Sequence, residues 1–138
     1  MKVKEVISMI DLDILKDRAI IKAFAAKHII LREGATEPYS MFIVLSGKAE
    51  VWRNFTNAQR TQLATLEPGE FFGEMSLFLK EPRSATVIAA TDVTLLELTP
   101  LNAMAVIKQN PELPYGLLAL LCRRIQSLNK KVNDLSKK

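Results

Sequence analysis

The stretch Gly69–Val87, which reads GEFFGEMSLFLKEPRSATV, carries the strongest structural signal in this chain of 138 residues. Gly73 permits a sharp backbone turn into a short helix, because glycine adopts conformations that other residues avoid. The first turn of a helix leaves its N–H groups unpaired at the positive end of the helix dipole, where anions bind. Arg83 adds a planar set of donors that suits a phosphate, and Glu74 can accept a hydrogen bond from a sugar hydroxyl. The stretch therefore predicts a site for one small ligand that carries both groups.

The same stretch resembles the phosphate-binding cassette of the cyclic-nucleotide-binding domain family, which includes bacterial catabolite activators, kinase regulatory subunits and nucleotide-gated channels. The family pattern is Phe-Gly-Glu-x-(Ala/Ser)-Leu, a short spacer, and Pro-Arg-(Ala/Ser)-Ala-Thr-Val. This chain supplies both halves in order, at Phe72–Leu77 and Pro82–Val87. The alternative is a buried helix start with a structural ion pair between Glu74 and Arg83, which would not require the surrounding small residues.

Outside the cassette, the sequence predicts a mainly β protein with flanking helices. Short apolar runs separated by frequent turns indicate antiparallel strands of a roll or sandwich rather than a parallel sheet. We expect these strands at residues 29–31, 39–45, 48–53, 59–66, 85–90 and 93–98. The resemblance implies the specific form, an eight-stranded antiparallel β-roll (a jelly roll, or double-stranded β-helix) that carries the cassette between two strands.

The chain is expected to form a single cyclic-nucleotide-binding domain over residues 1–138, since this length supports one core. Irregular helical spacing of apolar residues predicts N-terminal helices within residues 1–26. The β-roll is expected at 27–99, with the cassette at 72–87. Two C-terminal helices are expected at 100–138, because Pro100 can begin a helix and the pair Asn110-Pro111 ends it.

Composition and charge are those of an ordinary soluble globular protein, with 49% hydrophobic residues, 25% charged residues and a net charge of +4. Cys122 is the only cysteine, which excludes an intramolecular disulfide and fits a reducing compartment. No secretory signal is visible, and no apolar run approaches the roughly 20 residues that span a bilayer. The lysines near the C-terminus are interpreted as a solvated helix end. We therefore predict a cytoplasmic protein with no membrane segment.

The last predicted helix, from about residue 112 to 135, carries a heptad pattern. Its two sets of apolar positions are Leu118, Ile125 and Val132, and Leu121, Leu128 and Leu135. Isoleucine and valine in the first set with leucine in the second favour a parallel two-stranded coiled coil. Leu117 and Leu120 widen the stripe in the first half, which is therefore expected to pack on its own domain. The second half is predicted to form the seam of a homodimer.

The resemblance implies that the ligand is a cyclic mononucleotide, cAMP, with cGMP as the alternative. Threonine directly after the cassette arginine often accompanies cGMP preference, and this chain has Ser84 there. The phosphate would lie on Arg83 and backbone groups of the cassette, the ribose 2′-OH on Glu74, and apolar side chains against ribose and base. The expected ligand-binding residues are Leu63, Gly73, Glu74, Met75, Ser76, Arg83, Ser84, Ala85, Arg124 and Asn129.

In this family the last helix contacts the base. The run Arg123–Gln126 aligns with a similar run in the bacterial activator, which places Leu128 and Asn129 where that protein reads adenine with two small hydroxyl residues. Leu128 cannot form a hydrogen bond through its side chain, whereas Arg124 and Asn129 can, Asn129 from the partner subunit.

The predicted function is therefore a non-catalytic, ligand-sensing regulatory module that needs no cofactor or metal. A cupin-type enzyme on a β-roll would need several metal-binding histidines, and His28 is the only histidine. No winged helix-turn-helix follows the last helix, so we expect no DNA contact and an unidentified protein effector. Two alternatives remain, a ligand-independent dimerisation module and the sensor domain of a larger regulator. The Met1 start favours the stand-alone protein over the excised domain.

Overall fold

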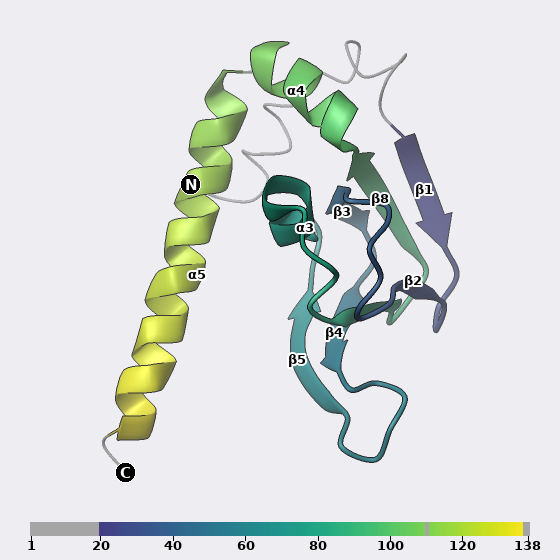
Figure 1. Ribbon diagram of the computed structural model, residues 1–138, viewed down its shortest axis with the longest axis vertical. Helices are drawn as coiled ribbons and strands as arrows, with labels where there is room; N and C mark the ends of the chain where they lie inside the picture. Colours follow the sequence, from purple (N-terminus) through teal and green to yellow (C-terminus); the bar gives the residue numbers. More distant parts are fainter. Residues whose placement is uncertain (1–19, 110, 137–138) are drawn as a thin grey trace.

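Two four-stranded antiparallel sheets form the body of the protein in the computed structural model, which describes residues 20–109 and 111–136 (Figure 1). One sheet has the order β1-β8-β3-β6 and the other β2-β7-β4-β5. The strands are β1 Ile20–Phe24, β2 Ile29–Leu31, β3 Met41–Ser46, β4 Ala49–Arg53, β5 Thr61–Leu66, β6 Phe71–Phe72, β7 Thr86–Ala89 and β8 Val93–Leu98. The expected mainly β fold of eight antiparallel strands is confirmed.

Strand β3 is buried on both of its faces. Successive side chains of a strand point to opposite sides, so β3 serves two parts of the core. Phe42 and Val44 pack in the cluster that includes Val87 of the second sheet, whereas Met41 and Ile43 pack in the cluster beneath the helices. The first sheet is thereby covered on one side by the second sheet and on the other by helices.

Three helices lie within the described residues, α3 Glu74–Leu79, α4 Pro100–Gln109 and α5 Glu112–Ser136. Ala103 and Val106 of α4 and Leu117 of α5 complete the core on the helical side. Leu120 and Leu121 also pack there, which confirms that the first half of α5 covers its own domain. Figure 1 shows α5 as one long helix beside the roll, with its second half continuing past α3. None of the described helices combines the length and apolar character that a membrane span requires.

Strand β1 corrects the boundary expected between the N-terminal helices and the roll. Residues 20–24 fall within the predicted helical segment, but they pair with β8, from Ile20 opposite Glu97 to Phe24 opposite Val93. Adjacent β-branched isoleucines favour a strand, and the pairing satisfies backbone groups of both strands, which local spacing does not reveal. The rest of the expected N-terminal helices, in residues 1–19, lies outside the described part of the chain.

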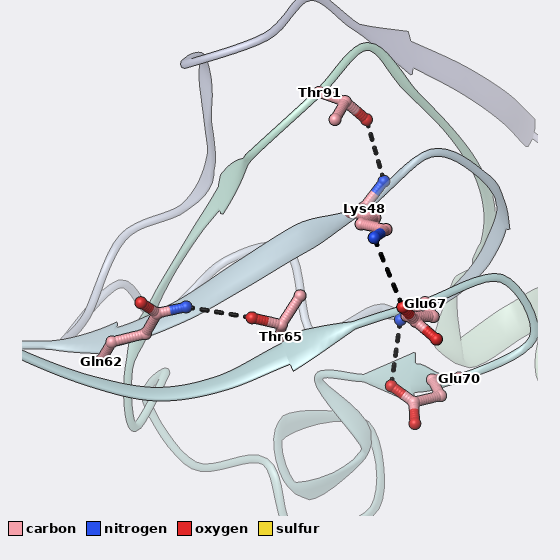
Figure 2. A network of polar contacts seen from close by, with 6 residues as sticks. All are labelled: Lys48, Gln62, Thr65, Glu67, Glu70 and Thr91. Carbon is pink, nitrogen blue, oxygen red and sulfur yellow. Dashed lines mark hydrogen bonds and ion pairs between the residues drawn. The ribbon is translucent and has the colours of Figure 1, made fainter.

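Polar contacts at the surface hold the turn between β5 and β6 (Figure 2). The Nζ of Lys48 lies 3.5 Å from Oε1 of Glu67, and the backbone N–H of Glu67 donates to Oε2 of Glu70 at 3.1 Å. The backbone N–H of Lys48 donates to Oγ1 of Thr91 at 3.0 Å. Exposed ion pairs of this kind add little to stability, so the pair of Lys48 and Glu67 contributes little to the energetics of the fold.

Candidate functional site: a cavity between the cassette and helix α5

A cavity of about 530 Å³ lies between the cassette, β5 and α5. This volume is within the usual range for sites that bind small organic molecules. Among the ligand-binding residues expected from the sequence, Asn129 alone does not line it, and the cassette, Leu63 and Arg124 do. Folding thus brings together residues as far apart in the sequence as Leu63 and Arg124.

Gly73 shapes the phosphate end of the cavity. Its φ of 82° lies in the left-handed region, and a Cβ there would come within 2.8 Å of Nη1 of Arg83 and 2.9 Å of the carbonyl oxygen of Ser40. Helix α3 begins at the next residue, and no side chain caps its N-terminus. The N–H groups of its first turn therefore have no helical acceptor, as an anion site requires.

Arg83 is a buried cation at the same end, with an exposed fraction of only 4%. Its Nη1 donates to the carbonyl oxygen of Gly73 at 3.2 Å, and its Nη2 donates to the carbonyl oxygen of Pro38. Burial lowers the pKa of Arg83 from its ordinary value, and the negative charge of Glu97 opposes that shift. An arginine stays protonated in proteins, and its guanidinium has more donors than these carbonyls use. Arg83 thus keeps donors available to an anion in the cavity.

Glu74 pairs with Arg124 rather than with Arg83. Oε1 of Glu74 lies 3.0 Å from Nη1 of Arg124, and the Nη2 of Arg124 donates to the carbonyl oxygen of Phe71. The Arg124 guanidinium also lies over the Phe71 ring, 4.1 Å from its centroid. The structural ion pair considered as the alternative from the sequence is therefore formed by a different arginine. Because Arg124 belongs to α5, this contact ties the helix to the cassette.

Ser127 and Lys131 are cavity residues that the sequence reasoning missed. They line the cavity together with Arg124 and Leu128 of the same helix. Ser127, Leu128 and Lys131 lie three, four and seven residues after Arg124. Residues at that spacing share one face of a helix. The alignment pointed to Leu128, which lines the cavity, and to Asn129, which lies five residues beyond Arg124 and so on another face. The expected contact of Asn129 from the partner subunit stays a prediction. Within the described residues, no group of three or more His, Cys, Asp or Glu side chains is placed to hold a metal ion.

A β-roll that places a buried arginine, a glutamate and an uncapped helix start at one cavity has the architecture of a cyclic-nucleotide sensor. The family model described as the cyclic nucleotide-binding domain matches residues 21–110. Because the match covers more than half of the sequence, the chain belongs to this family, as the cassette predicts.

Individual relatives extend this similarity. The chain is 38% identical over 97 residues to the cyclic AMP receptor protein of Thermus thermophilus, a match that covers 70% of this chain and 45% of that protein. It is 41% identical over 73 residues to a cyclic nucleotide-gated potassium channel of Mesorhizobium japonicum, covering 53% of this chain and 19% of the channel. The crystal structure of the Thermus thermophilus catabolite activator protein superposes with a TM-score of 0.74 at 30% identity, covering 97% of this chain and 58% of that one. The chain thus spans about half the length of the first curated relatives it matches.

Proposed function

We propose that this domain binds a cyclic mononucleotide, with cAMP preferred to cGMP, and acts as a non-catalytic ligand-sensing module. The observation that carries the proposal is that Arg83 and the uncapped start of α3, whose first residue is Glu74, line one cavity. A cyclic nucleotide presents an anionic phosphate beside a ribose hydroxyl, which is the pair of groups that these residues complement. The Thermus relative is named as a cyclic AMP receptor, which supports the same class of ligand.

In the proposed complex the phosphate accepts hydrogen bonds from Arg83 and from backbone N–H groups of the cassette, including those of Ser76, Ser84 and Ala85. Each hydrogen bond to a charged group contributes about 1.5–3 kcal/mol in such a setting. The apolar side chains of Leu63 and Met75, which line the cavity, pack against the ribose and base.

In this proposal, the part of the cavity that holds the base favours adenine over guanine. Ser84 stands where threonine would favour cGMP, and Ser127 is among the residues that line the cavity. A hydroxyl can both donate and accept, so Ser127 can accept from the amino group of adenine. Leu128 supplies apolar contact beside it.

Ligand binding would be coupled to α5 through Glu74. The carboxylate that is proposed to accept the ribose 2′-OH is already paired with Arg124 of the helix. A bound ribose must therefore share or replace that contact, and states of the helix with different Arg124 positions would bind the ligand with different affinities. Such a difference is what allows a ligand to shift a conformational equilibrium. The receiver of this change would be a protein effector or a neighbouring domain.

Calorimetric titration of the purified protein with cAMP and cGMP tests the proposed ligand directly. We expect micromolar or tighter binding, with cAMP tighter than cGMP, and no comparable binding of linear 5′-AMP. Binding of neither cyclic nucleotide by folded protein would contradict the proposal and favour the ligand-independent interaction module. Tighter binding of cGMP would contradict only the base preference.

Glu74 is expected to recognise the 2′-OH. The wild type should bind 2′-deoxy-cAMP at least about tenfold more weakly than cAMP, because one hydrogen bond to a carboxylate is lost. Glu74→Ala should bind the two ligands with nearly equal affinity, as measured by calorimetry. Glu70→Ala is the matched control, since Glu70 also lines the cavity but is assigned no ligand contact, and it should keep the wild-type preference. A Glu74→Ala protein that still discriminates between the ligands would refute this role.

We further propose that the second half of α5 forms a homodimer. Four apolar side chains in heptad register are solvent-exposed there by 55–65%, namely Ile125, Leu128, Val132 and Leu135. Covering such a row against an identical helix removes apolar surface from water and forms a coiled-coil seam. The seam also adjoins the ligand cavity, because Leu128 belongs to both.

Substituting Val132 with glutamate is expected to raise the dimer dissociation constant by at least about tenfold, since it places two like charges at the seam. Analytical ultracentrifugation over a concentration series measures this change. Asn133→Glu alters the charge equally at the neighbouring position outside the seam, and it should remain dimeric. A monomeric wild type, or a Val132→Glu protein that dimerises as well as the wild type, would be evidence against the seam.

A further inference from the structure

A buried carboxylate lies behind the cassette, outside the proposed ligand contacts. Glu97 of β8 is only 2% exposed, and its Oε2 accepts a hydrogen bond from the Oγ of Ser40 at 2.6 Å. Its Oε1 lies 2.7 Å from the Nζ of Lys22 on β1, and no other described group donates to that atom. A buried charge is costly unless it is paired, so the Lys22 ammonium is what makes this carboxylate tolerable.

Ser40 connects this carboxylate to Arg83. The Ser40 side chain donates to Glu97. The Ser40 carbonyl oxygen and the Nη1 of Arg83 both approach Gly73, since a Cβ there would come within 2.9 Å and 2.8 Å of them. Pro38, two residues earlier in the same segment, accepts the other hydrogen bond of the guanidinium. Glu97 is also the group whose negative charge raises the pKa of Arg83 against the effect of burial. Three charges of alternating sign therefore follow one another from the surface of β1 to the cavity.

We propose that Lys22 and Glu97 are positioning residues for the proposed nucleotide site, and that Lys22 keeps the charge of Arg83 available to the ligand phosphate. Lys22 does not line the cavity, so it acts through Glu97. Without Lys22, the buried carboxylate would have Arg83 as its counter-charge and would repel an incoming phosphate. Electrostatic effects between partly buried groups are weakly screened, so this repulsion would be felt at the cavity.

The structure favours this role over a purely structural one. The pair is itself weak evidence for stability, because the Lys22 side chain is 43% exposed and apolar residues often replace a buried ion pair without loss. Here the carboxylate acts electrostatically on Arg83, the proposed phosphate ligand, and it also holds Ser40 of the segment 38–40, whose Pro38 carbonyl accepts from the guanidinium. Glu97 thus helps to fix the position of the Arg83 donors. Lys22 cancels the negative charge that Glu97 adds near the site.

The test is a double-mutant cycle read out by nucleotide affinity. Lys22→Met is expected to weaken binding of cAMP by roughly three- to tenfold, an effect moderated by the partial exposure of Lys22. The double variant Lys22→Met/Glu97→Gln is expected to return to within about twofold of the wild type, because glutamine keeps a partner for Ser40 without the charge. Lys22→Arg should bind as the wild type does.

Lys48→Met is the matched control, since Lys48 also pairs with a carboxylate, but at the surface (Figure 2). It should leave the dissociation constant within about twofold of the wild type. Thermal unfolding of each variant establishes that titrations are made on folded protein. Should the double variant fail to fold, the contrast between Lys22→Met and Lys22→Arg still decides the proposal.

The possible outcomes separate this inference from the function on which it rests. A wild type that binds neither cAMP nor cGMP contradicts the proposed function, and with it a role for Lys22 in nucleotide affinity. A wild type that binds, together with an unaltered affinity in Lys22→Met, overturns only the inference about Lys22. Weak binding in Lys22→Met that Glu97→Gln does not restore also overturns it, because charge cancellation requires the rescue.

Discussion

Replacing Arg83 with alanine is expected to weaken cyclic-nucleotide binding by at least about tenfold, equivalent to about 1.4 kcal/mol or more. The guanidinium is almost fully buried and is already oriented by two backbone carbonyls, so little further ordering is needed when the phosphate arrives. Its loss would leave phosphate oxygens without a charged donor in a partly desolvated cavity, and unsatisfied groups of that kind are costly.

The same substitution should also lower thermal stability, because the carbonyl oxygens of Gly73 and Pro38 lose their donor and Glu97 loses a nearby positive charge. Binding is therefore measured by calorimetry at a temperature where unfolding curves show the variant to be folded. Arg83→Lys should fall between the wild type and Arg83→Ala, since lysine keeps the charge but not the planar fork. Arg53→Ala, which removes an exposed arginine at the end of β4, is the control and should bind normally. Wild-type affinity in folded Arg83→Ala would exclude Arg83 as the phosphate ligand.

Gly73→Ala is expected to have the second large effect, a loss of nucleotide affinity of at least about tenfold together with a lower melting temperature. The left-handed conformation costs a residue with a Cβ about 1–2 kcal/mol. The added methyl group would in addition lie 2.8 Å from Nη1 of Arg83 and 2.9 Å from the Ser40 carbonyl oxygen, so one of them must move. Either displacement disturbs the guanidinium that is proposed to bind the phosphate.

Gly34→Ala separates the effect of the left-handed backbone conformation from the effect of the close approach to Arg83. Gly34 has a φ of +85°, nearly that of Gly73, but a Cβ there meets no heavy atom within 4 Å among the described residues. It should therefore lower the melting temperature and leave nucleotide affinity close to that of the wild type. If the two alanine variants bind cyclic nucleotide equally well, the close approach of Arg83 to Gly73 is not important for binding.

Local sequence signals predicted much of the architecture because they depend on neighbouring residues. The turn and helix start at Gly73, the strand at Val93–Leu98 and the helix from Pro100 all follow from short-range spacing and backbone preference, and the structure has each of them. The two-residue strand β6 is too short to show a period. Strand β1 was assigned to a helical segment because its partner β8 lies about 70 residues away in the sequence. Pairing with a distant strand is not encoded in local periodicity.

The sequence by itself determined the class of the domain and the cassette residues that line the cavity, because the cassette is contiguous and its chemistry is local. Only the tertiary structure decided the pairing of charges. Glu74 pairs with Arg124 of α5, and Glu97 pairs with Lys22 of β1, rather than either carboxylate with a neighbour in sequence. It also placed Ser127 and Lys131 on the face of α5 that lines the cavity. A long helix can present any of its faces to the roll, and the packing of Leu117, Leu120 and Leu121 sets which one it is.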